Sequence, residues 1–232
     1  GCVMAPKRRL VNGFLSQSGL PAGGGGRWFG AGCAGGAAMR DQAVQRFLDA
    51  AEAAIAVSAD PGSAAGRAAG LVFARSRDSL GAVGQPMAIQ LPVCAHLEAA
   101  LDGAEEGPRG AVADALGALV DRLEWKRRLS ADPADRVFWD GHANAIILGP
   151  GGLEDRDDLW IGVTVMAPGV TYVDHDHPPE EVYLSLAPGE WWNTDMDWTD
   201  PGMGGLIYNP PGIRHAMRSG AGPFLALWFL PI

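Results

Sequence analysis

The sequence predicts a mainly β protein, with a β-barrel or sandwich over residues 131–232 that follows an α-helical region over residues 40–130. Up to residue 129 the apolar residues recur at the three- and four-residue spacing of helices. After "SADPAD" (130–135) the spacing changes to the two-residue period of strands. Short sequences rich in Gly and Pro also punctuate the second half, which is typical of barrels and sandwiches.

Composition and charge restrict the class of protein. The 232 residues suffice for one large domain or two small ones with a buried core. The net charge of -9 argues against nucleic acid or an anionic membrane as a partner. Cys2, Cys33 and Cys94 form no CxxC pair, so neither a disulfide framework nor a zinc ribbon is expected. No apolar run approaches the ~20 residues that span a bilayer, and we therefore expect a soluble, cytoplasmic protein.

The N-terminal segment differs from the rest of the chain. The first forty residues carry five basic residues and no acidic one, and residues 21–38 are of low complexity. An acid-poor basic leader can be a targeting segment, but the apolar core of a secretory signal is missing. We interpret residues 1–39 as a disordered leader upstream of a natural start at Met39.

Four helices are expected in the helical region. The first begins near Asp41, the second covers residues 61–77, the third begins at Pro92, and the fourth covers residues 110–129. The apolar stripe of the first helix consists of Val44, Phe47, Leu48, Ala51 and Ile55. That of the fourth consists of Val112, Leu116, Leu119, Val120 and Leu123.

Strands are expected at residues 159–166, 181–186 and 224–230. In the first of these, Ile161, Val163 and Val165 share one face, because side chains two apart in a strand point the same way. The turn sequences "APG", "NPPG" and "SGAG" separate these segments from their neighbours.

A cluster of metal-binding side chains lies in "HDHPPEEVY" (175–183), in a chain with only five histidines. The two-residue period places His175 and His177 on one face. Glu181 belongs to the polar face of the next strand, whereas Glu180 falls on the apolar face, so Glu181 is the expected ligand. Two imidazoles and a carboxylate can hold Zn²⁺ or another first-row divalent ion.

A fourth ligand should come from elsewhere in the chain. His215 is the natural candidate, because it follows the turn in "YNPPGIRH" (208–215) and begins a short strand. His96 and His142 lie outside the β pattern around the cluster and are interpreted as ordinary surface or core histidines. Zn, Fe, Mn, Co and Ni all bind such nitrogen-rich sites, so the metal stays open.

Two motifs carry a family resemblance. The pattern G-x5-HxH-x3-E-x7-G over 169–189 resembles the first cupin motif, with one residue more than usual before the last Gly. The pattern G-x5-PxG-x2-H over 204–215 resembles the second, with Ser219 in place of the usual asparagine. The resemblance covers about the last hundred residues. It implies a C-terminal cupin barrel, which is a double-stranded β-helix or jelly-roll.

The details narrow the resemblance. The pattern HxHxxxExY, together with a helical region before the barrel, resembles the bacterial cupin-type dimethylsulfoniopropionate lyases. Carried over by motif position, the implied ligands of one divalent transition metal are His175, His177, Glu181 and His215. The implied catalytic base is Tyr183.

The implied reaction is a β-elimination that yields acrylate and dimethyl sulfide. Because a free tyrosine has a pKa near 10, a tyrosine base predicts activity that rises with pH. Aromatic faces attract a sulfonium group, although barrel core is the expected role for any single aromatic residue. The candidates for substrate binding are Tyr172, Tyr208, Trp191, Trp192 and Trp228.

Two other functions fit a cupin metal site. An iron-dependent cupin dioxygenase would consume oxygen and would need no base at Tyr183. A non-catalytic sensor would bind a metal or small ligand without turnover. The expected partner is a small zwitterionic sulfonium compound, with a homodimer as a further possibility.

Overall fold

The computed structural model describes residues 39–104 and 108–232. The leader predicted at residues 1–39 lies outside these residues except for Met39. The helical elements are α1 (Gln42–Ser58), α2 (Ala64–Asp78), η1 (Pro92–His96), α3 (Leu97–Asp102), α4 (Pro108–Gly117), η2 (Val120–Arg122) and α5 (Arg136–Gly141). The strands are β1 (Ala82–Val83), β2 (His142–Leu148), β3 (Glu154–Asp155), β4 (Leu159–Met166), β5 (Thr171–His175), β6 (Glu181–Ser185), β7 (Gly189–Asn193), β8 (Met196–Thr199), β9 (Leu206–Asn209), β10 (His215–Ser219) and β11 (Phe224–Pro231).

Local sequence explains where the first two helices begin. The Asp41 carboxylate accepts hydrogen bonds from the backbone N–H groups of Ala43 and Val44 at 2.9 and 3.1 Å, and so caps α1. Ser63 caps α2 in the same way through Gly66. Both helices form where the spacing predicts them, and the expected stripe of α1 is buried.

The fourth helix is shorter than predicted. It ends at Gly117, and η2 follows instead of a continuous helix to residue 129. The chain then runs antiparallel to β2, where Lys126 and Asn144 exchange backbone hydrogen bonds of 2.8 Å. Glycine favours a helix end, so the apolar stripe beyond Gly117 marks buried residues of an irregular segment. The region 40–130 also contains the short strand β1, and is thus not wholly helical.

The strands form two sheets. The larger has the order β1-β3-β2-β4-β11-β6-β9, and the smaller has the order β5-β10-β7-β8. The neighbouring strands from β2 to β9 in the larger sheet, and from β5 to β7 in the smaller sheet, pair antiparallel, as a cupin barrel requires. The predicted fold class, a β-barrel preceded by helices, is therefore confirmed.

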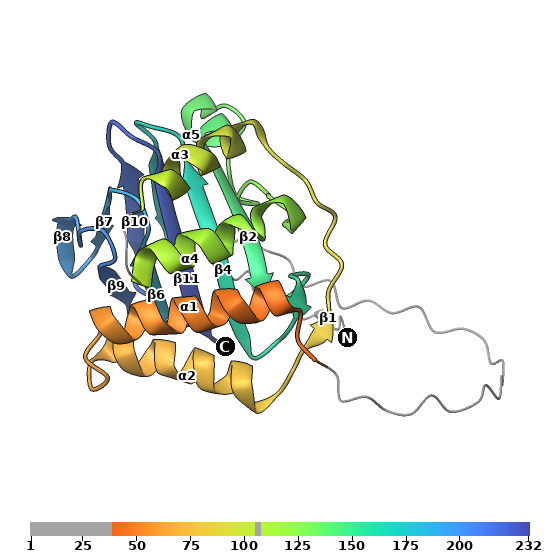
Figure 1. The fold of residues 1–232 in the computed structure, drawn as a ribbon. Coiled ribbons are helices and arrows are strands. Elements are labelled where there is room, and N and C mark those ends of the chain that lie inside the picture. The colour runs from red at the N-terminus through yellow and green to blue at the C-terminus, as the bar shows by residue number, and fades with distance from the viewer. Residues whose placement is uncertain (1–38, 105–107) are drawn as a thin grey trace, which may run out of the picture.

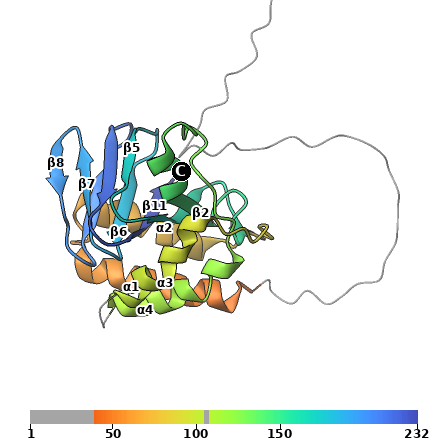
Figure 2. The same ribbon diagram turned by 90° about the horizontal axis from the view of Figure 1, so that it is seen from above.

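The molecule has three layers (Figures 1 and 2), with α1–α4 covering one face of the larger sheet and the smaller sheet packing on its other face. Successive side chains of β4 point alternately toward the helices and toward the smaller sheet. Ile161, Val163 and Val165 join the helices in one hydrophobic cluster, which we call the helix-side core. Trp160 and Met166 belong to a second cluster between the sheets, the barrel core. Both faces of β4 are buried, so its second face is not exposed to water.

No helix within residues 39–104 and 108–232 is long and apolar enough to span a membrane.

Candidate metal centre

Three histidines meet inside the mouth of the barrel. His175 ends β5 and His215 begins β10, and the two residues are direct partners in the antiparallel register. Their ring centroids are 4.1 Å apart. His177 follows in the loop after β5, with its ring centroid 5.0 Å from that of His215. One ring nitrogen from each lies within 4.8 Å of the other two, and all three residues are buried.

Backbone carbonyls fix the orientation of each ring. The Nδ1 atoms of His175, His177 and His215 lie 3.0, 2.9 and 3.0 Å from the carbonyl oxygens of Val173, Pro179 and Ile213 respectively. A carbonyl only accepts hydrogen bonds, so each Nδ1 carries a hydrogen, and in the neutral imidazoles Nε2 is the ring nitrogen that could bind a metal. This outer-shell arrangement is the one that orients histidines which bind metals.

Glu181 completes the cluster from the other sheet. It begins β6, and its Oε2 lies 3.1 Å from His177 Nε2 and 3.2 Å from His215 Nε2. Burial opposes ionisation, but the adjacent His177 and His215 lower the pKa of the Glu181 carboxyl below its usual value. Glu180 points to the opposite side of the strand, where it accepts a hydrogen bond from Tyr208.

The donor set fits a divalent cation. Within the described residues, Glu181 Oε1 and His215 Nε2 are buried without a hydrogen-bond partner. Such atoms are costly unless something binds them. Three imidazoles and one carboxylate are donors that suit a first-row divalent metal, and the candidate set is His175, His177, Glu181 and His215. These candidate residues come from both sheets, since β5 and β10 belong to the smaller and β6 to the larger.

A narrow cavity adjoins this cluster inside the barrel. It has about 230 Å³ of space between atoms, part of which is open to solvent. It is lined by Asn144, Thr164, Tyr172, His175, Glu181, Tyr183, Met217 and Trp228. Tyr183 lies on the same face of β6 as Glu181, and its ring centroid is 6.3 Å from that of His215. Burial, and then the negative charge of Glu181, raise the pKa of Tyr183 well above its usual value.

The five aromatic candidates divide into two groups. Tyr172 and Trp228 line the cavity, and Trp191 lies in the barrel core beside Tyr183. Tyr208 is paired with Val182 rather than Tyr183, so it faces the helix-side core. Trp192 alternates with Trp191 on β7 and is half-buried on the other face. The structure does not bring Tyr208 and Trp192 to the cavity, and we leave them out of the proposed site.

His142 is a core histidine, as expected, but it begins β2 and so belongs to the β region. Its Nε2 accepts a hydrogen bond of 2.9 Å from the backbone N–H of Arg128, while its Nδ1 contacts the Phe138 carbonyl. Burial is the main cause that lowers the pKa of His142 to about 4.

Sequence reasoning missed two polar residues that line the cavity and one that lies beside the ring of Tyr172. Asn144 and Thr164 line it from β2 and β4, and Arg128 approaches from the segment beside β2. No local motif marks these residues. The run "HANAIIL" (142–148) contains no clear alternation, because both faces of β2 are buried.

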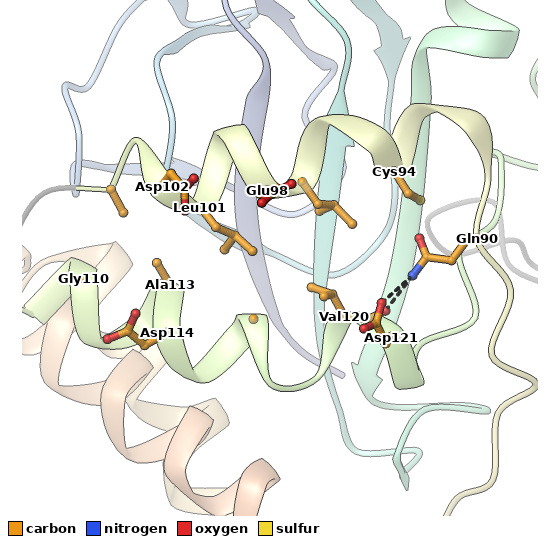
Figure 3. Close-up of a pocket in the computed structure, with 13 residues that line it drawn as sticks. Gln90, Cys94, Glu98, Leu101, Asp102, Gly110, Ala113, Asp114, Val120 and Asp121 are labelled. Atoms are coloured by element: carbon orange, nitrogen blue, oxygen red, sulfur yellow. Dashed lines mark hydrogen bonds between the residues drawn. The ribbon is translucent and has the colours of Figure 1, made fainter.

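A larger hollow lies between α3 and α4 on the helical side (Figure 3) and has about 1,340 Å³ of empty space. Its acidic residues are Glu98, Asp102, Asp114 and Asp121, and Gln90 donates a hydrogen bond to Asp121 at 3.2 Å. None of the described residues that line it is a histidine. Size alone therefore does not identify the site, and the small cavity with convergent imidazoles is the better candidate.

Known proteins are similar to this chain in sequence and in fold. A family model described as dimethylsulfoniopropionate lyase matches residues 67–226, which is more than half of the chain. The chain is 36% identical over 130 residues to a putative dimethylsulfoniopropionate lyase DddL of Cereibacter sphaeroides, covering 56% of this chain and 54% of the relative. It is 33% identical over 120 residues to the dimethylsulfoniopropionate lyase DddQ of Ruegeria pomeroyi, covering 50% of this chain and 59% of the relative. The chain thus spans little more than half the length of these curated relatives.

The similarity extends to three dimensions. The crystal structure of the lyase DddQ from Ruegeria pomeroyi superimposes with a TM-score of 0.65 at 27% sequence identity. The match covers 83% of this chain and 93% of that chain, and so includes helices as well as the barrel.

Proposed function

Because the chain belongs to the dimethylsulfoniopropionate lyase family, we propose that it cleaves dimethylsulfoniopropionate to acrylate and dimethyl sulfide. The observation that supports this most is Tyr183, which lines the same cavity as Glu181 and His175. A carbon–sulfur lyase of this type needs a base, a means to stabilise negative charge, and a site that excludes water. The barrel interior supplies residues for each.

We assign the metal ligands to His175, His177, Glu181 and His215. A divalent transition metal bound there would supply positive charge that favours both a Tyr183 phenolate and the negative charge developing on the substrate's carboxylate. Zn, Fe, Mn, Co and Ni each suit three imidazoles and a carboxylate.

In the proposed mechanism, Tyr183 Oη takes the proton from the carbon next to the carboxylate. The C–H electron pair forms the carbon–carbon double bond, and the C–S electron pair leaves with sulfur. The products are acrylate and neutral dimethyl sulfide, and Tyr183 then returns the proton to solvent. Since the sulfonium is already a good leaving group, no general acid is required. Cation–aromatic attraction to Trp228 would hold the sulfonium in the cavity.

The direct test is gas release by the purified, metal-loaded protein with dimethylsulfoniopropionate in sealed vials. We expect headspace chromatography to detect dimethyl sulfide equally under nitrogen and under air. Release that requires oxygen would instead indicate the iron-dependent dioxygenase. Tight binding without release would indicate the non-catalytic sensor.

Replacing the proposed base provides the first variant test. Tyr183→Phe should lower kcat by about 10²–10⁴-fold, the usual contribution of a positioned base. Its metal content should not change. Tyr208→Phe removes the same hydroxyl from the opposite face of the adjacent strand and should retain turnover. Equal activity of Tyr183→Phe and the parent chain would exclude a tyrosine base at this position.

A further inference from the structure

Arg128 lies beside the cavity without being part of the metal cluster. Its guanidinium carbon is 5.8 Å from the centroid of the Tyr172 ring, and Tyr172 lines the cavity. The Nε donates to Ser130 at 2.6 Å. The Nη1, by contrast, is fully buried and meets no acceptor at hydrogen-bonding geometry within the described part of the chain. Burial raises the pKa of the Tyr172 hydroxyl, and the same guanidinium lies near enough to this hydroxyl to oppose that larger effect. A buried guanidinium N–H with no acceptor is costly, which suggests that an anionic group from outside the chain meets it.

The backbone around Arg128 is firmly held. Its N–H donates to His142 Nε2 at 2.9 Å, and two residues earlier Lys126 exchanges two backbone hydrogen bonds with Asn144. Arg128 and Asn144 therefore belong to neighbouring, paired segments. A guanidinium on such a support is better positioned for recognition than one on a free loop.

A chain of hydrogen bonds sets the direction of the Tyr172 hydroxyl. Trp228 Nε1 donates to Thr164 Oγ1 at 3.2 Å, and Thr164 Oγ1 donates to Asn144 Oδ1 at 2.6 Å. Asn144 Nδ2 then donates to Tyr172 Oη at 2.9 Å. An indole N–H can only donate, so it anchors the direction of the chain. Tyr172 receives a hydrogen bond, and its own hydrogen has no acceptor among residues 39–104 and 108–232.

We propose that Arg128 and the Tyr172 hydroxyl form an anion-binding end of the cavity that recognises the substrate's carboxylate. Asn144 and Thr164 are positioning residues that keep Tyr172 as a donor. That the bound substrate is dimethylsulfoniopropionate rests on the proposed function. That this end of the cavity binds a carboxylate does not. The positive charge of Arg128 also repels a sulfonium, so the zwitterion enters in one orientation. Its cationic end then lies toward the aromatic faces of Tyr183 and Trp228.

The test separates the two ends of the zwitterion and needs no turnover. Calorimetry on the metal-loaded full chain would measure binding of propionate, the anionic half, and of trimethylsulfonium, the cationic half. Arg128→Met should weaken propionate binding at least tenfold and leave trimethylsulfonium binding equal or tighter. Arg128→Lys should recover part of the propionate affinity, because it keeps the charge but not the planar fork.

The matched control is Arg127→Met, which removes a neighbouring cation that stacks on Trp139 instead and donates to its carbonyl. It should bind propionate like the parent chain. Unchanged propionate affinity in Arg128→Met, or equal weakening of both halves, would overturn the proposal.

The positioning residues have their own test. Thr164→Val removes the donor to Asn144 and should weaken propionate binding selectively, whereas Thr164→Ser should restore it. With dimethylsulfoniopropionate as substrate, Arg128→Met should raise KM at least tenfold and change metal content little. If no dimethyl sulfide forms but propionate binding still depends on Arg128, the lyase assignment fails and the anion site stands. If dimethyl sulfide release is normal but propionate binding does not change in Arg128→Met, the lyase assignment stands and the proposed anion site fails.

Discussion

At the scale of single residues, two adjacent glutamates have opposite environments. Glu181 is 1% exposed and contacts His177 and His215, whereas Glu180 on the other side of the strand pairs with Tyr208. The alternation of a strand therefore decides which carboxylate meets the imidazoles. The sequence allowed this choice, because Val182, Leu184 and Leu186 mark the apolar face.

Glutamate-to-glutamine changes at these two positions form a matched pair. Glu181→Gln keeps the shape but removes the charge, so we expect metal affinity to fall at least tenfold because a neutral amide is a poor metal ligand. Glu180→Gln should keep the metal content of the parent chain. Elemental analysis after dialysis against a weak chelator measures both. Full occupancy in Glu181→Gln would remove this residue from the ligand set.

At the scale of elements, the junction of α5 and β2 depends on an uncharged histidine. His142 is fully buried, stacks on Phe138 at 3.7 Å, and uses one ring nitrogen as donor and the other as acceptor. Protonation would place a second N–H against the Arg128 N–H. Burial thus lowers the pKa of His142 to about 4, below the 6.5 of an unfolded chain.

This lowered pKa predicts acid sensitivity. The unfolded chain binds the proton near pH 6.5 and the folded chain only near pH 4, so stability is complete above pH 6.5 and declines as the pH falls toward 4. The loss from this group approaches about 3 kcal/mol, at 1.36 kcal/mol per pKa unit. His142→Gln cannot titrate, so it should start less stable at pH 7 but decline less. Urea unfolding at pH 7 and pH 4.5 measures the difference. Parallel declines would show that His142 does not titrate on unfolding.

The same elements show what one sequence can and cannot predict. Local periodicity located α1, α2, β4, β6 and β11, because each repeats its pattern over several residues. The same periodicity wrongly predicted that α4 continues past Gly117, because the residues that follow are apolar but form an irregular segment. It did not identify Arg128 or Asn144, because their place at the cavity depends on pairing between distant segments. The histidines of the two motifs could be predicted from the sequence, since His175 and His215 each follow a recognisable turn.

At the scale of the whole molecule, helices and barrel share the helix-side core. Phe73 of α2 contacts Phe229 of β11 with ring centroids 5.5 Å apart, and both are buried. The predicted boundary between residues 40–130 and 131–232 divides the sequence, but the apolar cluster continues across it. We therefore expect the helical layer to stabilise the sheet that carries Glu181 and Tyr183.

Loss of this contact should affect both parts together. Phe73→Ala should cost about 3–5 kcal/mol, the usual effect of truncating a buried phenylalanine. Helical circular dichroism and tryptophan fluorescence should lose signal at one shared denaturant concentration. Leu71→Ala, at a position on the same helix that is 42% exposed, should cost less than about 1 kcal/mol. Two separate transitions would instead show that the helical region and the barrel fold independently.

The placement of β6 between β11 and β9 has a consequence for how related chains can diverge. Hydrogen bonds on both edges hold the register of β6, so its side chains cannot be re-sorted by sliding the strand. An odd insertion or deletion that shifted this register would send Glu181 and Tyr183 to the helix side and bring Val182 inward. Because β6 cannot slide, a change in the length of the linker over residues 178–180 would instead displace His177, whose ring is oriented by the Pro179 carbonyl, so we expect the spacing between His177 and Glu181 to be kept.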